Sequence, residues 1–519
     1  MGQIGTYCKR EWPTFLVIAL AFGAQLYLVT RSIPTLIQTL IPDDAFFSFQ
    51  LARNILEGLG SSLDGIHSSN GYHPLWTLLL VLVYKLFPGA WPQETALHAG
   101  MILPPIFVTL MVLVLSRVFT RFAENPWIRA FGMGILLLNP FFLYGTVNGL
   151  ETPLALCLFS LFFLLALRIE EGRPIGEYAL IGLVGGMMFL ARLDMAFYLV
   201  AFALWLLIQK GFWSALRPGV VFSLFAGLSI IPWIVWNWVE FGMFLQTSAS
   251  AGEAMWSHAV TIQDRGTNLL LFLKDTVFYT QRGLDTYFFA LTGIYALGSA
   301  FLGALVYMLV RGDIAIPKRL REIPVALMLF GGAAVYFFVD ASIRWGWREW
   351  HYVPFNIFLA IGIIMAMREL IKRATYPRMT GAALAALVLF SFAVNWSINF
   401  QPGKTHYAWQ TGLLAASEWM NENLPEGSRV ATYTPGIQAY FSRMRIVDLD
   451  GLINNSAYEA MRENRLWAYT KEEADYVNIY ERDYAFSHKS FQGSDPYQDL
   501  ELVADIPKSG GVFIYRIKK

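Results

Sequence analysis

Long runs of apolar residues, separated by short polar segments, recur along most of the chain. Several runs, such as Phe15–Val29 and Val220–Val239, approach or reach the roughly 20 apolar residues that a helix needs to cross a bilayer. The pattern therefore predicts a polytopic α-helical membrane protein with about eleven spans. The predicted spans lie near residues 12–30, 96–119, 128–145, 150–168, 176–191, 195–210, 219–239, 286–310, 323–339, 350–367 and 380–398.

The apolar segment Pro74–Phe87 does not fit this series. At about 14 residues it is shorter than the roughly 20 that a span requires. Counting it as a span would also invert the orientation of everything that follows it. We interpret it as a re-entrant or membrane-lying helix (residues 74–87) inside a first outer loop, residues 31–95. A layout of about thirteen spans is the alternative.

The composition agrees with a membrane protein, and the positions of the basic residues predict its orientation. Hydrophobic residues make up 56% of the 519 positions and charged residues 15%, whereas a soluble domain carries roughly 25% charged residues. The net charge of +1 gives no indication of a nucleic-acid partner. Cytoplasmic loops are rich in Lys and Arg, so the side on which the basic clusters fall is predicted to be the cytoplasm. These clusters are Lys9 and Arg10; Arg117, Arg121 and Arg129; Arg168 and Arg173; Lys210 and Arg217; Arg311, Lys318, Arg319 and Arg321; and Arg368, Lys372, Arg373 and Arg378.

The chain after about residue 400 differs in composition, with mixed charge and no run long enough to span a membrane. Its alternating helix and strand patterns predict a small α/β domain with a partly parallel sheet, outside the cytoplasm. We therefore divide the chain into a transmembrane domain, residues 1–399, and an extracytoplasmic domain, residues 400–519. The predicted elements include helices Leu413–Asn423 and Ile437–Phe441 and strands Arg429–Tyr433, Ile446–Leu449 and Val512–Tyr515.

A pair of carboxylates, Asp43 and Asp44, follows the first span. Ionisable groups near a membrane are expensive and mark functional sites. One Asp would suffice to cap the helix that follows. The second suits a general base, or the pair suits a divalent cation.

Other polar residues are predicted on the same outer side. Simple structural roles exist for each: an aromatic belt for the first loop, a helix dipole for Glu151 and a local ion pair for Arg192 with Asp194. Arginine also binds phosphate well through paired N–H groups. Together with Asp43 and Asp44, these polar residues form the layout expected for a reaction between a lipid phosphate and a hydrophilic acceptor. They are Asn70, Tyr72 and His73 in the first loop, then Glu151, Arg192 and Asp194, and Arg344, Arg348, His351 and Tyr352 in the last outer hairpin.

At these positions the chain resembles the GT-C superfamily of membrane glycosyltransferases, which use polyprenyl-phosphate sugars. The tail resembles the outer domain of bacterial arabinofuranosyl- and mannosyltransferase-like members. A departure from the family pattern is the single proline after His73. The matching segments are 43–47 (Asp-Asp-Ala-Phe-Phe), 51–55 (Leu-Ala-Arg-Asn-Ile) with Gly58 and Gly60, 70–76 (Asn-Gly-Tyr-His-Pro-Leu-Trp), 190–194 (Leu-Ala-Arg-Leu-Asp), 419–425 (Trp-Met-Asn-Glu-Asn-Leu-Pro) and 448–452 (Asp-Leu-Asp-Gly-Leu).

The resemblance implies a bacterial inner-membrane enzyme that transfers a sugar from a polyprenyl-phosphate donor to an acceptor hydroxyl at the outer face. Asp44, or Asp43, would be the general base, with Asp44 preferred for its spacing to the 51–55 segment. The lipid phosphate is assigned to Arg348 first, then to Arg344 and Arg192. The remaining substrate-binding candidates are His73, Tyr72, Asn70, Glu151, Asp194, His351 and Tyr352.

The expected partners are the lipid-linked donor, membrane lipid, and a glycan, lipid or protein acceptor. A divalent cation stays open, because some members of the superfamily need one and others do not. The sugar, whether arabinofuranose or mannose, and the stereochemical outcome also stay open. A lipid-linked-sugar flippase or a transporter is the alternative, but transporters usually show inverted repeats and broken helices near the membrane midplane. No repeat is evident here, and the ionisable residues collect at one face.

Overall fold

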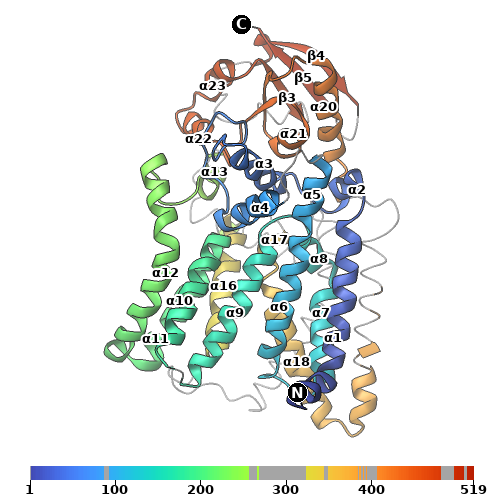
Figure 1. The fold of residues 1–519 in the computed structure, drawn as a ribbon, viewed down its shortest axis with the longest axis vertical. Coiled ribbons are helices and arrows are strands. Elements are labelled where there is room, and N and C mark those ends of the chain that lie inside the picture. Colours follow the sequence, from blue (N-terminus) through green and yellow to red (C-terminus); the bar gives the residue numbers. More distant parts are fainter. Residues whose placement is uncertain are drawn as a thin grey trace.

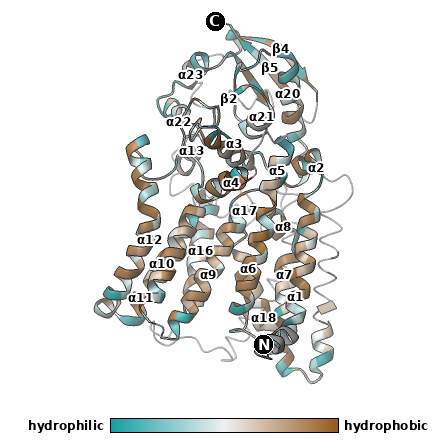
Figure 2. Cartoon of the chain, in the orientation of Figure 1, coloured by the Kyte–Doolittle hydropathy of each residue, from teal (hydrophilic) through white to brown (hydrophobic). Residues whose placement is uncertain are grey.

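The computed structural model describes residues 2–86, 93–172, 174–255, 266–267, 323–343, 349–383, 385–386, 390, 393, 406–480, 496–507 and 511–518. They form two parts, stacked along the long axis of the molecule (Figure 1). A bundle of helices carries the N-terminus at its far end, and a mixed α/β domain, here called the C-terminal domain (residues 406–518), covers the other end. The bundle is largely hydrophobic, whereas the C-terminal domain is mostly hydrophilic (Figure 2).

Five helical segments of the described chain are long and apolar enough to cross a membrane, and each coincides with a predicted span. They are Glu11–Val29, Gln93–Phe119, Thr152–Glu170, Leu193–Lys210 and Phe212–Phe241. Four shorter apolar helices cover Pro74–Leu86, Pro126–Leu137, Gly176–Ala191 and Val325–Asp340. The predicted span 286–310 lies outside the described residues, as does most of 380–398.

The elements of the bundle are α1 (Gly2–Val29), α5 (Gln93–Met101), α6 (Leu103–Phe119), α7 (Pro126–Leu138), α8 (Pro140–Thr146), α9 (Thr152–Glu170), α10 (Gly176–Ala191), η1 (Leu193–Met195), α11 (Ala196–Lys210), α12 (Phe212–Phe241), α16 (Val325–Ile343), α17 (Glu349–Tyr352) and α18 (Phe355–Arg373). Between the bundle and the C-terminal domain lie α2 (Ile33–Thr39), α3 (Ala45–Leu56), α4 (Pro74–Leu86) and α13 (Ser248–Met255).

Two predicted spans differ from single continuous helices. The segment predicted at 128–145 is divided into α7 and α8 at Asn139–Pro140, and the one predicted at 350–367 is divided into α17 and α18 before Phe355. Proline lacks a backbone N–H and forces the preceding residue toward an extended conformation. Asn139 has that conformation, with φ −66° and ψ 120°. The hydrophobic pattern did not reveal these breaks.

Helix α4 is amphipathic. Trp76, Leu80 and Tyr84 are buried on one face, and the Trp76 indole N–H donates to the carbonyl of Gly149 at 3.1 Å. The opposite face carries a stripe of exposed leucines with a spacing of four residues. This stripe consists of Leu78, Leu82 and Leu86.

The small sheet predicted for the C-terminal domain is present. Within the described residues it has five strands in the order β2-β1-β3-β5-β4, with β1 parallel to β2 and β3, and β5 antiparallel to β3 and β4. Sequence patterns missed β3 and β4. The strands are β1 (Arg429–Thr432), β2 (Arg445–Asp448), β3 (Tyr476–Tyr480), β4 (Leu500–Ile506) and β5 (Val512–Ile517), and the helices are α20 (Gln410–Asn423), α21 (Pro435–Phe441), α22 (Asn455–Arg462), α23 (Leu466–Glu473) and η4 (Pro496–Asp499).

Close backbone contacts fix the C-terminal domain on the first outer loop. A Cβ added to Gly71 would lie 1.7 Å from the carbonyl oxygen of Leu452, and one added to Gly436 would lie 2.1 Å from that of Asp43. Glycine is therefore required at both positions, because any side chain would push the domain away.

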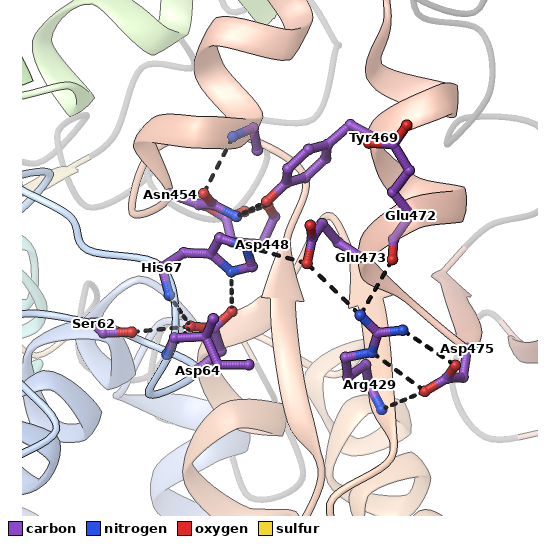
Figure 3. Close-up of polar contacts among 12 residues, drawn as sticks. Ser62, Asp64, His67, Arg429, Asp448, Asn454, Tyr469, Glu472, Glu473 and Asp475 are labelled. Carbon is purple, nitrogen blue, oxygen red and sulfur yellow. Dashed lines mark hydrogen bonds and ion pairs between the residues drawn. The ribbon is translucent and has the colours of Figure 1, made fainter.

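A polar contact joins the same two parts farther out (Figure 3). The ring of His67, in the loop after α3, lies 2.6 Å from Asp64 through Nδ1 and 3.4 Å from Glu473 of α23 through Nε2. Arg429 continues the network, with guanidinium nitrogens 3.8 Å from Glu473 and 3.4 Å from Asp475. We call the set of His67, Asp64 and Glu473 the latch.

Candidate functional site

A cavity of about 440 Å³ lies where the bundle, the first outer loop and the C-terminal domain meet. Most of the residues predicted for the site lie on its wall, although they come from distant segments of the chain. These are Asp43, Asp44, Tyr72, His73, Glu151, Arg192, Asp194 and His351. Residues far apart in the sequence thus meet around one cavity.

Asp43 and Asp44 have different surroundings. The carboxylate of Asp43 is buried and accepts backbone hydrogen bonds from Gly436 at 3.0 Å and from Ile437 at 2.7 Å, both in α21. Burial raises the pKa of Asp43 to about 7, and the charge of Asp44 adds to the shift, although the Ile437 N–H opposes it. Both carboxylate oxygens thus attach the C-terminal domain to the first outer loop.

Asp44 precedes α3 and lies on the cavity wall. Its side chain forms no capping hydrogen bond with that helix. Helix capping, the simplest structural explanation for an Asp at this position, therefore does not account for the side chain. Of the two, Asp44 is the one placed to meet a molecule in the cavity.

Arg192 is buried between two carboxylates. Its guanidinium lies 2.9 Å from Glu151 and 2.5 Å from Asp194, and it also donates to Thr152 at 3.2 Å. The Nε–H donates to Asp194 as well. Four of the five N–H groups of this side chain are therefore directed at protein oxygens.

His73 completes this group, with Nε2 at 3.5 Å from Glu151. Burial lowers the pKa of His73, and the charge of Glu151 opposes this shift without cancelling it. With a neutral imidazole, the one positive charge of Arg192 faces the two negative charges of Glu151 and Asp194. The group is net negative.

The last outer hairpin reaches the cavity through Trp350 and His351, whose ring nitrogen Nδ1 lies 3.0 Å from Asp340. Arg344 and Arg348 lie outside the described residues, and so does the side chain of Tyr352. The described residues on either side of these arginines thus meet at Asp340 and His351, and His351 lies on the cavity wall.

Asn70 lies behind the cavity rather than on it. Its carboxamide is fully buried and joins four segments of the chain. The oxygen accepts from the Thr247 backbone N–H and from Asn455, each at 3.0 Å, and the nitrogen donates to Asn237 at 3.3 Å. Asn70 thus holds the cavity wall together.

Sequence reasoning missed the part of the wall that the C-terminal domain supplies. Two of its segments directly follow β1 and β2, so the ends of the predicted strands were the signal that could have identified them. Gln246, from the loop after α12, was also missed. The wall residues from the C-terminal domain are Tyr407, Trp409, Gln410, Tyr433, Thr434, Asp450, Leu452 and Ile453.

Across the described parts of the chain, no group of three or more His, Cys, Asp or Glu side chains has a geometry that could hold a metal ion. Asp43 and Asp44 alone do not form such a group.

Comparison with known proteins extends these observations. The family model described as dolichyl-phosphate-mannose-protein mannosyltransferase matches residues 74–236. A model described as a domain of unknown function matches residues 399–515. No curated protein matches the chain by sequence.

Two solved structures share its fold. ArnT from Cupriavidus metallidurans, bound to undecaprenyl phosphate, has a TM-score of 0.59 at 10% identity, over 96% of this chain and 97% of that one. The oligosaccharyltransferase of Archaeoglobus fulgidus, tethered to an acceptor peptide, has a TM-score of 0.52 at 14% identity, over 91% of this chain and 70% of that one. The resemblance of this chain to the GT-C glycosyltransferases is confirmed, in sequence by the mannosyltransferase model and in fold by these two structures.

Proposed function

We propose that the protein is a glycosyltransferase that transfers a sugar from a polyprenyl-phosphate donor to an acceptor hydroxyl at the outer face of a bacterial inner membrane. The observation that carries this proposal is the cavity itself. It brings Asp44, the Arg192 group and the last outer hairpin together at the junction between an apolar bundle and a polar domain. A lipid-linked donor can reach such a junction from the membrane, and a hydrophilic acceptor can reach it from water.

In this reaction Asp44 is the general base. Its carboxylate takes the proton of the acceptor hydroxyl while that oxygen bonds to the anomeric carbon of the sugar. The bond between the anomeric carbon and the phosphate oxygen breaks, and its electron pair leaves with the polyprenyl phosphate. Asp43 positions Asp44 by fixing the first outer loop on α21.

Phosphate binding is assigned to Arg348 and Arg344 before Arg192. The partners of Arg192 already neutralise it and leave its group net negative, so it would attract a phosphate only weakly. Arg348 lies three residues before His351, which lines the cavity. Arg192 then serves to orient Glu151 and Asp194 toward the substrate.

The arrangement in the membrane is part of the proposal. Residues 1–399 form the transmembrane domain, and residues 400–519 lie in the periplasm. Helix α4 is too short to span a bilayer. Its leucine stripe lies against the outer leaflet. The transferred sugar is a hexose or a pentose.

The test uses the purified full chain in lipid nanodiscs. Undecaprenyl phosphate should bind saturably, and undecaprenyl-phosphate mannose or the arabinofuranose analogue should release undecaprenyl phosphate in the presence of a cell-envelope extract. The Asp44→Asn variant should bind the lipid and release it at least about 100-fold more slowly. In sealed proteoliposomes, a flippase would instead move the lipid-linked sugar across the bilayer without breaking the sugar–phosphate bond, and that result would refute the proposal.

A further inference from the structure

We propose that the C-terminal domain builds the acceptor subsite of the cavity and that this subsite takes a carbohydrate, held by Trp409 and Asp450. The inference rests on the proposed function, because it assigns one side of the same cavity to the second substrate. It concerns residues that the proposed chemistry does not use.

The location of this wall is the first reason. Tyr433 and Thr434 directly follow β1, and Asp450 and Leu452 lie in the turn after β2, which ends at Asp448. Strands β1 and β2 are parallel neighbours, so both segments leave the sheet at the same edge. Ligands of α/β sheets bind outside the carboxyl ends of parallel strands. The sheet thus presents its usual binding edge to the cavity.

The turn that carries Asp450 is held in one conformation. The carboxylate of Asp448 accepts from the backbone N–H of Asp450 at 2.8 Å and of Ile453 at 3.0 Å, and Asp450 accepts from Leu452 at 2.7 Å. Gly451 has φ +72°, a left-handed conformation that glycine adopts without strain. A wall ordered before binding avoids the entropic cost of ordering it afterwards.

The chemistry of the wall matches a sugar. Trp409 packs against Tyr480 with ring centroids 5.2 Å apart, which fixes the indole beside the cavity. A sugar ring has C–H faces that pack on aromatic rings and an edge of hydroxyls that bond to carboxyl groups. Tyr407 and Tyr433 extend the aromatic surface, and Thr434 adds a hydroxyl. A prenyl chain would need no carboxyl group here.

Charge and size support the same class of ligand. Burial raises the pKa of Asp450 well above its usual range, and the adjacent Asp448 adds to the shift. A neutral carboxyl group both donates and accepts hydrogen bonds, as hydroxyls require, and does not select a basic peptide. The cavity of about 440 Å³ lies in the range of small-molecule sites, roughly 300–1,000 Å³. It has room for sugar units rather than for a folded protein.

The experiment measures binding of defined probes to the full chain in nanodiscs by saturation-transfer NMR. The probes are methyl α-D-mannopyranoside, methyl α-D-arabinofuranoside and a neutral hexapeptide, with undecaprenyl phosphate measured in parallel. At least one glycoside should bind saturably. Trp409→Ala and Asp450→Ala should each weaken it by about three- to tenfold, the loss of one aromatic contact or one hydrogen bond. Trp213→Ala and Asp505→Ala, at exposed positions away from the cavity, should not.

Undecaprenyl phosphate binding should be unchanged in all four variants. If no glycoside binds, or if Trp409→Ala and Asp450→Ala leave glycoside binding intact in a folded protein, the carbohydrate subsite is refuted. Peptide binding that depends on Trp409 would refute it as well. If the unmodified protein binds a glycoside but not undecaprenyl phosphate, the proposed function is overturned, whereas the carbohydrate subsite is supported.

Discussion

The adjacent residues Asp43 and Asp44 make different contacts in the folded protein. The sequence presents them as an equivalent pair, and only their contacts separate them. Both residues line the cavity, but Asp43 accepts backbone hydrogen bonds from α21 through both carboxylate oxygens, whereas the Asp44 side chain makes no capping bond with α3. Contacts between residues nearly 400 positions apart leave no trace in a local pattern, so the pair could be predicted as a site but its two roles could not.

Asp44→Asn should lower turnover by about 100- to 10,000-fold, the usual effect of removing a general base. Asparagine keeps the size of the side chain but cannot take the acceptor's proton. Donor affinity, measured with undecaprenyl phosphate, should stay within about twofold, because the phosphate is assigned to arginines elsewhere. Turnover near that of the unmodified enzyme would contradict the assignment.

Asp43→Asn should act on stability more than on the chemical step. The amide can accept from one of the two N–H groups of α21 and turns its own N–H toward the other. A buried donor left without an acceptor costs about 1–3 kcal/mol, which should appear as a lower midpoint in thermal unfolding. If turnover falls further in this variant than in Asp44→Asn, the two roles must be exchanged.

Arg348→Ala should weaken undecaprenyl phosphate binding by about ten- to a hundredfold, the loss of a charge-assisted hydrogen bond. Arg192→Ala is the comparison. It leaves Glu151 and Asp194 buried without their cation, which costs about 3–5 kcal/mol, so it should destabilise the fold. Intact donor affinity in a folded Arg348→Ala protein would move the phosphate to Arg344 or Arg192.

At the scale of elements, the sequence predicted those whose pattern is local and strong. The long apolar helices and the strands β1, β2 and β5 were found, whereas β3 and β4 were missed. Strand β3 (Tyr476–Tyr480) is buried on both faces at nearly every position, so it lacks the alternation that identifies a half-exposed strand. The broken helices at Asn139–Pro140 and before Phe355 belong to the same class of error, because a proline interrupts the helix without interrupting the hydrophobic run.

The latch makes the contact between the first outer loop and α23 dependent on pH. Burial alone would lower the pKa of His67, but the hydrogen bond to Asp64 and the charges of Asp64 and Glu473 outweigh it and raise the pKa. A raised pKa in the folded state means that the contact is fully stabilising below the unfolded pKa of about 6.5. The stabilisation is lost as the pH rises through the higher folded value.

The midpoint of thermal unfolding should therefore fall between pH 6 and pH 8 by more in the unmodified protein than in His67→Gln. His98→Gln, whose ring contacts the Val29 carbonyl within the bundle, is the matched control and should keep the full pH dependence. Equal pH profiles for the unmodified protein and His67→Gln would show that the latch does not titrate in this range.

At the scale of the whole molecule, composition and the placement of basic residues were sufficient to predict a membrane bundle with a polar domain at one end. They were not sufficient to predict the cavity, because its wall depends on how a separate α/β domain docks on the first outer loop. The glycines that permit this docking, Gly71 and Gly436, are informative only once their partners are known.

The orientation of the molecule in the membrane is the last prediction, and the proposed reaction depends on it. The C-terminal domain forms part of the cavity wall, so the cavity and the domain must lie on the same side of the membrane. A reporter fused after Lys519 that is active only outside the cytoplasm should be active, and one that is active only inside should not. Cysteine introduced at Glu57, an exposed position of the first outer loop, should react with a membrane-impermeant reagent added from the outer side. Cysteine at Lys210, the exposed last residue of α11 and part of a basic cluster predicted to be cytoplasmic, should react only after the membrane is permeabilised. A reporter active in the cytoplasm would place Asp44 and the C-terminal domain there, and the acceptor would then have to be a cytoplasmic molecule.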